Sequence, residues 1–277
     1  MKTIKLFTLL LALVIMSSCE KEQVSEQPGV EATQQIQDVS SQIRKKVASL
    51  NFNSKHVEKN NMLLPDGSFT ENYLIEGDIV MTEDEMHTMS SASITDKQYR
   101  TYNLVSTPRT VNVIGYTGGS QALTNKQRTA LQWTIDNYNA LNLGITFTLT
   151  FGTNYSPYDI VVYQNPNGEA GGVAGFPSNG NPYKYVQIYS GMEAYSTNTN
   201  EHVITHEIGH AVGLRHTDWF SRESCGQSGE GADPDGAVHI PGTPTGYDAT
   251  SVMLACFGAN EDGEFGSNDV TALNYLY

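Results

Sequence analysis

The distribution of hydrophobic and polar positions predicts an α+β protein. Between residues 125 and 141, apolar side chains return every three or four positions, which is typical of one buried helix face. Thr124 and Gln127 form a capping box at its start. Shorter runs rich in β-branched and aromatic residues predict strands at residues 111–116, 145–151, 159–163 and 185–189. We expect these elements to form one compact unit over residues 106–277.

A second, weaker pattern occupies residues 41–105. Ile43, Val47 and Leu50 have amphipathic spacing, and residues 73–81 read as one strand. A helix is expected to start at Thr82, where Glu85 stands in capping-box register. Ten of the sixteen basic residues of the chain lie before position 105. The composition therefore changes near that point, and we expect a separate region to end there.

The first forty residues have the pattern of an export signal followed by a linker. Residues 1–18 start with two lysines and contain a largely apolar run at 6–16. As a helix this run is roughly 16 Å long, too short for a hydrocarbon core of ~30 Å, so it predicts a signal peptide. The small residues directly before Cys19 resemble a bacterial lipobox, in which that cysteine is lipidated; an ordinary secretory signal is the alternative. Residues 19–40 lack periodicity and predict a tether.

Charge and cysteine content narrow the possible partners. The chain has 16 basic and 30 acidic residues, and loss of residues 1–18 removes two lysines, which takes the formal charge from −14 to −16. Nucleic-acid binding is excluded as a function class because it depends on Lys and Arg displacing counterions. Membrane contact is expected through the lipid anchor only, at the bacterial cell envelope, or the protein is secreted. Outside the cytoplasm, Cys225 and Cys256 most simply form a disulfide, with two buried thiols as the alternative.

The most informative segment is His-Glu-Ile-Gly-His at residues 206–210, followed by Gly213 and His216. On a helix, His206 and His210 lie one turn apart on the same face, so both imidazoles can bind a single ion. Gly213 allows the chain to leave the helix through a left-handed residue and to bring His216 back as a third ligand. Three protein ligands with a fourth position for water define a catalytic zinc site. The spacing therefore predicts one bound Zn²⁺.

Glu207 follows the first histidine and lies about 100° around the helix from it. It is too close to be a comfortable ligand but can reach the metal-bound water as a general base. Four apolar residues lie on the opposite side of the helix: Ile204, Ile208, Ala211 and Val212. We expect the helix to bury that face and to direct the other toward solvent. A structural zinc site is the alternative, but it would normally have a fourth Cys or His ligand.

This spacing is the metzincin signature, His-Glu-x-x-His-x-x-Gly-x-x-His. The HEIGH spelling, the Thr217-Asp218 pair and residues 241–256 are similar to the dual-action HEIGH metallopeptidases, protease B-like metzincins, and the resemblance extends over about residues 105–277. Met253, in the sequence Ser-Val-Met, resembles the Met-turn residue that lies beneath the metal in metzincins.

The resemblance implies a twisted mixed sheet with an active-site helix, and a small C-terminal subdomain that begins after Gly213. Residues 268–277 would form the closing helix. Ala255 stands where some metzincins have a tyrosine ligand, so no such ligand is expected here. A bond between Cys225 and Cys256 would tie the loop after the third histidine to the floor of the site.

A short motif in the N-terminal region also resembles a known device. The sequence Ile-Glu-Gly-Asp-Ile at residues 75–79 is similar to the aspartate switch in the pro-segments of astacin-type metzincins. This implies that Gly77 permits close backbone approach and that the Asp78 carboxylate occupies the water position on zinc. We therefore interpret residues 41–105 as the pro-region of a zymogen. The alternative is a strand that ends in an acidic turn.

The sequence thus predicts an exported, zinc-dependent endopeptidase that acts on protein or peptide substrates. Two other classes stay open: a zinc-bearing surface module that binds without hydrolysis, and a hydrolase of cell-wall peptides or amides. The strand at residues 185–189 is a candidate edge for pairing with an extended substrate, and an internal strand is its alternative. Residues 262–264 are interpreted as a solvated acidic turn rather than a calcium site. The oligomeric state is not predicted.

Overall fold

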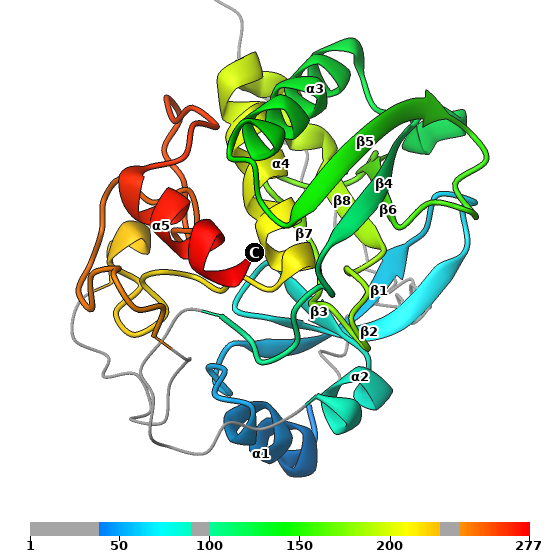
Figure 1. Ribbon diagram of the computed structural model, residues 1–277. Coiled ribbons are helices and arrows are strands. Elements are labelled where there is room, and N and C mark those ends of the chain that lie inside the picture. Colours follow the sequence, from blue (N-terminus) through cyan, green and yellow to red (C-terminus); the bar gives the residue numbers. More distant parts are fainter. Residues whose placement is uncertain (1–38, 90–99, 228–238) are drawn as a thin grey trace, which may run out of the picture. The chain divides into compact units, whose positions relative to one another are not determined.

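The computed structural model describes residues 39–89, 100–227 and 239–277, so the signal peptide, Cys19 and nearly all of the predicted tether lie outside the described residues. The elements, in chain order, are α1 (Ser41–Ser49), β1 (Val57–Leu63), β2 (Phe69–Ile75), β3 (Ile79–Met81), α2 (Glu83–Thr88), β4 (Arg109–Tyr116), η1 (Gly119–Gln121), α3 (Asn125–Ala140), β5 (Ile145–Gly152), β6 (Ile160–Asn165), β7 (Gly172–Val173), β8 (Tyr185–Tyr189), η2 (Ser190–Ala194), α4 (Thr197–Val212), η3 (Glu223–Cys225) and α5 (Ser267–Leu276). Helices and strands are mixed as predicted for an α+β protein (Figure 1). Among the described helices, none combines the length and apolar character needed to cross a membrane.

The strands form two sheets. The N-terminal region contributes an antiparallel sheet with the order β1-β2-β3. The larger sheet has the order β5-β4-β6-β8-β7, and its strands are parallel except for β7. This mixed sheet and the helix that carries the histidines agree with the predicted fold class.

The expectation of one strand at residues 73–81 was wrong. Two strands, β2 and β3, occupy this stretch, and the turn between them contains Glu76 at φ 57° and Gly77 at φ 101°. Both angles lie in the left-handed region, so the chain reverses there instead of continuing as a strand. The apolar residues on either side concealed this turn because both strands are buried at their ends near it.

The strand predicted at residues 185–189 is present as β8, but it is not an edge strand. It pairs with β6 on one side and with β7 on the other, so the prediction of a free edge at β8 was wrong. The outer position belongs to β7, which the sequence pattern did not show because only Gly172 and Val173 form it. Ile79 also forms a parallel bridge with Ala174, just beyond β7.

Helices α3 and α4 pack on one face of the larger sheet (Figure 1). The capping box at Thr124 is present at the start of α3, as predicted. Inside the helix pair, the hydroxyl of Tyr138 donates to the carbonyl of Thr205 at 3.0 Å, and Thr134 contacts Thr205 through their hydroxyls. These buried bonds fix α4 against α3 and therefore fix the direction of the histidine-bearing helix.

The N-terminal region covers the other face of the same sheet. Successive strand residues alternate between the two faces, so Ile114 and Val161 pack against Met62 and Val80 rather than against the helices. The carbonyl of Leu63 accepts hydrogen bonds from Tyr163 Oη and Gln187 Nε2, both at 2.7 Å, and both bonds are buried between the N-terminal region and the sheet.

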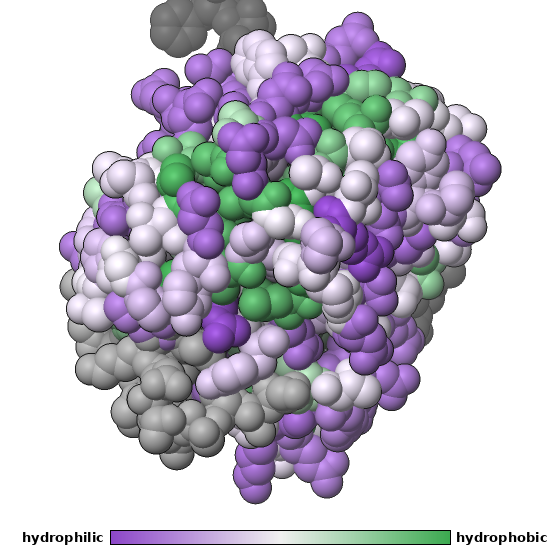
Figure 2. All heavy atoms as spheres, in the orientation of Figure 1, coloured by the Kyte–Doolittle hydropathy of each residue, from purple (hydrophilic) through white to green (hydrophobic). Residues whose placement is uncertain are grey.

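The outside of the protein is polar where Figure 2 shows it. Hydrophilic side chains cover most of the visible face, and hydrophobic ones gather in a limited area near its middle. Buried apolar residues of the described chain form a large cluster on the helix side of the larger sheet and a smaller one on its other face.

Candidate metal centre

Helix α4 places two of the predicted ligands on one face. Ser196 caps its start by accepting a hydrogen bond from the amide of Thr199. The helix ends at Gly213, whose φ of 112° is left-handed, as predicted from the motif. This exit returns the chain so that the imidazole of His216 lies against that of His210, with 4.9 Å between ring centroids.

The rings of His206 and His210 are oriented by main-chain carbonyls. His206 Nδ1 lies 2.9 Å from the carbonyl oxygen of Val252, and His210 Nδ1 lies 2.8 Å from that of Leu214. A carbonyl can only accept, so each Nδ1 carries the hydrogen, and in the neutral ring each Nε2 is left with a lone pair. Both Nε2 atoms are therefore free to bind a cation.

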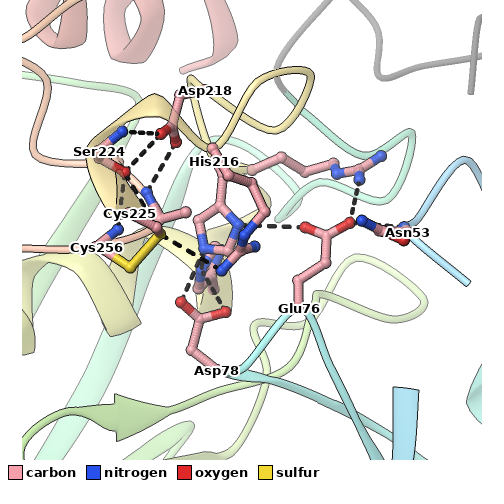
Figure 3. Close-up of polar contacts among 12 residues, drawn as sticks. Asn53, Glu76, Asp78, His216, Asp218, Ser224, Cys225 and Cys256 are labelled. Carbon is pink, nitrogen blue, oxygen red and sulfur yellow. Dashed lines mark hydrogen bonds and ion pairs between the residues drawn. A yellow bond between two sulfur atoms is a disulfide. The ribbon is translucent and has the colours of Figure 1, made fainter. Parts of the chain in front are cut away.

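The third imidazole is oriented by a carboxylate of the N-terminal region (Figure 3). His216 Nδ1 lies 3.2 Å from Glu76 Oε2, and its Nε2 lies 3.2 Å from that of His210. Two lone pairs at this distance repel each other unless a proton or a metal cation lies between them. Orientation of a ligand imidazole through its other nitrogen is also typical of metal sites.

Asp78 completes a four-residue cluster with the three histidines. Its Oδ2 lies 2.8 Å from His216 Nε2 and 3.4 Å from His206 Nε2, and its Oδ1 lies 4.0 Å from His210 Nε2. Metal bonds of about 2.0–2.1 Å in tetrahedral geometry separate ligand atoms by roughly 3.3 Å. His206 Nε2 is buried without a hydrogen-bond partner. The residues present therefore fit a bound metal ion.

The turn that carries Asp78 covers the histidine face of α4. The carbonyl of Asp78 accepts from the amide of Ala174 at 3.0 Å, and the amide of Val80 donates to the carbonyl of Ala174 at 2.9 Å. His206 is only 6% exposed and His210 is fully buried. The expectation that this face is directed toward solvent was therefore wrong, because the N-terminal region lies over it. The opposite, apolar face is buried as predicted.

Glu76 also links the N-terminal region to Arg215, the residue directly before His216. Its Oε1 accepts from the amide of Asn53 at 2.9 Å and lies 3.4 Å from Arg215 Nη2. The guanidinium of Arg215 stacks on Phe52 at 3.9 Å from the ring centroid. Although burial opposes ionisation, His216 and Arg215 lower the pKa of Glu76 to about 2. Burial likewise opposes the charged form of His216, but the carboxylates of Asp78 and Glu76 raise its pKa to about 9.

Glu207 lies beside this cluster with an unused carboxylate oxygen. It is 2% exposed, and its Oε2 has no hydrogen-bond partner. A β-carbon at Gly172 would lie 2.9 Å from Glu207 Cγ, so the glycine in β7 permits this close approach. Burial, and then the negative charge of Asp78, raise the pKa of Glu207 well above its ordinary value. The unpaired Oε2 is suited to accept a proton from a neighbouring water.

Met253 lies against α4 at Gly209. A β-carbon at Gly209 would lie 2.5 Å from the sulfur of Met253, which explains the glycine inside the HEIGH sequence. The carboxylate of Asp269, near the start of α5, accepts from Ser251 Oγ at 2.7 Å and from the amide of Val252 at 3.0 Å. The turn at residues 251–253 is therefore tied to α5, and it supplies the carbonyl that orients His206.

The predicted disulfide between Cys225 and Cys256 is confirmed (Figure 3). Asp218 lies beside it and accepts hydrogen bonds from the amides of Ala255 and Ser224, at 2.9 and 3.0 Å. Asp218 therefore caps the loops around the disulfide, and among the described contacts it has no bond to a ligand histidine.

Sequence reasoning brought Asp78 and the three histidines to one place but missed other residues of the site. Glu76 was assigned no role of its own in the Asp78 motif. Its position two residues before Asp78 nevertheless indicated that it could lie near the same site. Arg222 drew no attention because a lone arginine in a loop has no pattern. Asp262 is exposed and its Oδ1 accepts from the amide of Glu264 at 3.3 Å, which is the geometry of an acidic turn.

Comparisons with known proteins place the motif in a family. A family profile described as dual-action HEIGH metallo-peptidase matches residues 73–277, a segment that starts within the predicted pro-region and includes Glu76 and Asp78. A comparison with curated proteins found no match. Two solved structures of myroilysin are similar, both with a TM-score of 0.41. The first is 15% identical, and the similarity covers 63% of this chain and 82% of the myroilysin chain. The second is 14% identical, and the similarity covers 72% of this chain and 98% of the myroilysin chain.

Proposed function

Because the chain belongs to the dual-action HEIGH metallopeptidase family, we propose that it is a zinc-dependent endopeptidase of metzincin type. His206, His210 and His216 hold the ion, and Glu207 acts as general base. The observation that carries the proposal is the convergence of three imidazole Nε2 atoms on one point beside a buried carboxylate oxygen without a partner. Protein or peptide substrates follow from the peptidase family.

Different residues of the chain have different roles in the proposed hydrolysis. A bound zinc ion supplies Lewis acidity, which lowers the pKa of water and polarises a carbonyl. Glu207 accepts the proton of the attacking water on its free Oε2 and transfers it to the nitrogen of the leaving amine. The carbonyls of Val252 and Leu214 hold the imidazoles in the tautomer that leaves Nε2 free. The reaction has no covalent intermediate on the protein.

Glu207→Gln separates an enzyme from a binding module. Casein hydrolysis by the wild type should stop on addition of a chelator and return with Zn²⁺, whereas Glu207→Gln should bind zinc yet lose nearly all activity. Glu169→Gln is the matched control, because Glu169 is an exposed residue outside the cluster. Hydrolysis that survives Glu207→Gln or chelation would contradict the proposal.

We further propose that residues 41–105 are a pro-region that keeps the enzyme latent through Asp78. The Asp78 carboxylate lies among the three imidazoles, at the place that a water would take on the ion. The segment that carries it is hydrogen-bonded to both the amide and the carbonyl of Ala174, next to the outer strand β7. An extended substrate could not pair with that stretch of chain while Asp78 and Val80 occupy it.

Asp78→Ala tests the latency. The unprocessed variant should hydrolyse casein several-fold faster than the unprocessed wild type, because the fourth position becomes free for water. Asp84→Ala, on the exposed first turn of α2, is the matched control and should change nothing. An Asp78→Ala chain that is uncleaved and no more active than the wild type would leave the pro-region without its proposed role.

The export route is a separate part of the proposal. Residues 1–18 act as a signal peptide, and Cys19 carries lipid at the start of residues 19–40, the tether to the cell envelope. Mass spectrometry of the purified protein's N-terminus measures both features at once. A mature N-terminus other than Cys19, or Cys19 without added lipid mass, would support the secreted alternative.

A further inference from the structure

The cleft at the metal cluster extends beyond the residues that the reaction uses. It has a volume of about 300 Å³ and continues from Asp78 and Glu207 toward the segment after the Met-turn. There it is lined by residues that play no part in the proposed chemistry: His202, Val203, Arg222, Leu254 and Phe257. This space adjoins the point where a scissile bond would lie, so it is suited to hold a substrate side chain next to that bond.

Arg222 differs from every other arginine of the chain. The other five each donate to an oxygen atom: Arg44, Arg100, Arg109, Arg128 and Arg215. Among the described residues, Arg222 makes one side-chain contact, from Nη2 to the sulfur of Cys225 at 3.6 Å. Its Nε and Nη1 are buried and have no hydrogen-bond partner within the same described part of the chain. Burial of a cation without an acceptor is unfavourable, so an anionic group is the partner that this side chain lacks.

The backbone holds Arg222 in place rather than leaving it free to turn away. Its amide donates to the carbonyl of Asp218 at 2.7 Å, and its carbonyl accepts from the amide of Cys225 at 2.9 Å. The disulfide between Cys225 and Cys256 ties the same loop to another residue that lines the cleft. A side chain presented from such a braced loop loses little conformational freedom when it binds a ligand.

We propose that this part of the cleft binds an acidic side chain of the substrate, with its carboxylate on the guanidinium of Arg222. The inference rests on the proposed peptidase function and adds a preference for Glu or Asp beside the scissile bond. Val203 and Phe257 offer apolar contact to the methylene groups, and Arg222 supplies the charge-assisted hydrogen bonds. An apolar cleft alone would favour aliphatic residues, so the charge decides the preference.

The experiment compares matched peptides in the full chain that carries Asp78→Ala. Each of three positions on either side of the cleaved bond holds Glu, Asp, Gln or Leu in turn, and kcat/KM is measured for each peptide. We expect Glu or Asp to be favoured over Gln roughly tenfold at one position. Arg222→Gln should remove this ratio by lowering kcat/KM for the Glu and Asp peptides. Arg222→Lys should keep part of it, and Arg222→Glu should favour a Lys peptide instead.

Arg128→Gln is the matched control, because Arg128 lies on α3 and does not line the cleft. Peptide affinity is measured in parallel by fluorescence anisotropy with the Glu207→Gln protein, which reads the preference without turnover. If no peptide is cleaved but acidic peptides bind more tightly and lose this advantage in Arg222→Gln, the proposed function fails and the inference stands. Equal affinities for Glu and Gln peptides, or a preference that survives Arg222→Gln, would overturn the inference.

Discussion

The two parts of the chain that meet at the metal cluster support it in different ways. The C-terminal part holds His206 and His210 through neutral main-chain carbonyls, which come from its own Met-turn and helix exit. The N-terminal part holds His216 through the charged carboxylate of Glu76 and adds Asp78 as a fourth donor. The first kind of support stays with the catalytic unit in any form of the protein. The second is present only while the N-terminal region remains in place.

This difference gives the N-terminal region two roles at one site. In the proposed latent form Asp78 fills the position that water needs, whereas Glu76 contacts His216 and lies beside Arg215. Removal of the region would therefore free the fourth position and also take away the partners of His216 and Arg215. The latent form is expected to bind the ion more tightly than a form without residues 41–105.

The largest effect should come from loss of a ligand that both parts share. His216→Ala removes the imidazole on which Glu76 and Asp78 converge, so stoichiometric zinc and hydrolysis should both be lost. Metal content by mass spectrometry and casein hydrolysis measure this. His202→Ala, on the same helix but outside the cluster, should keep its zinc. Full zinc content in His216→Ala would mean that His206 and His210, which main-chain carbonyls orient, are sufficient to bind the ion. The N-terminal region would then add no support to the site.

Glu76→Gln tests the charged support that the N-terminal region gives to His216 and Arg215. It leaves the buried Arg215 without its carboxylate, and breaking such a pair costs about 3–5 kcal/mol of the free energy of unfolding. Loss of the bond to His216 should weaken zinc binding about tenfold to a hundredfold. Urea unfolding of the metal-free protein and zinc titration measure the two effects. Glu71→Gln, at an exposed position of β2, should change neither.

The pH dependence of that loss has a definite sign. The pKa of Glu76 is lowered from 4.5 to about 2, so its stabilisation is complete above pH 4.5 and is lost as the pH falls toward 2. The difference in unfolding free energy between the wild type and Glu76→Gln should therefore shrink over this range. His216 remains protonated in both states below its ordinary pKa of 6.5 and does not obscure the trend. A difference that is independent of pH would show that the charge of Glu76 is unimportant.

The sequence was most informative where chemistry depends on local spacing. The helix that carries His206 and the left-handed exit at Gly213 follow from residues within one or two turns of each other, so the motif alone predicts them. The capping boxes at Thr82 and Thr124 are local in the same sense. The resemblance also drew attention to Asp78, which the structure brings to the histidines from more than 120 positions away in the chain.

Features that depend on contacts between distant segments could not be predicted. Nothing local shows that the turn after β2 lies over α4, or that residues 172–173 form the outer strand of the sheet. The role of Glu76 follows from its meeting with Arg215, 139 positions later. Arg222 Nε and Nη1 lack a hydrogen-bond partner among the described residues, and only a three-dimensional arrangement can reveal that.

The smallest of these effects should come from the C-terminal side of the comparison. The carboxylate of Asp269 accepts from Ser251, from the amide of Val252 and from the amide of Gly266, and so ties the Met-turn to α5. Asp269→Asn replaces an acceptor oxygen by a donor and should cost about 1–3 kcal/mol of the free energy of unfolding. Zinc should stay bound, because the Val252 carbonyl still reaches His206 in most molecules. Urea unfolding checks the loss, with Asp262→Asn as the exposed control. Asp269→Asn could instead release the metal as readily as His216→Ala. The orientation of His206 would then depend on one carboxylate, as the orientation of His216 depends on Glu76.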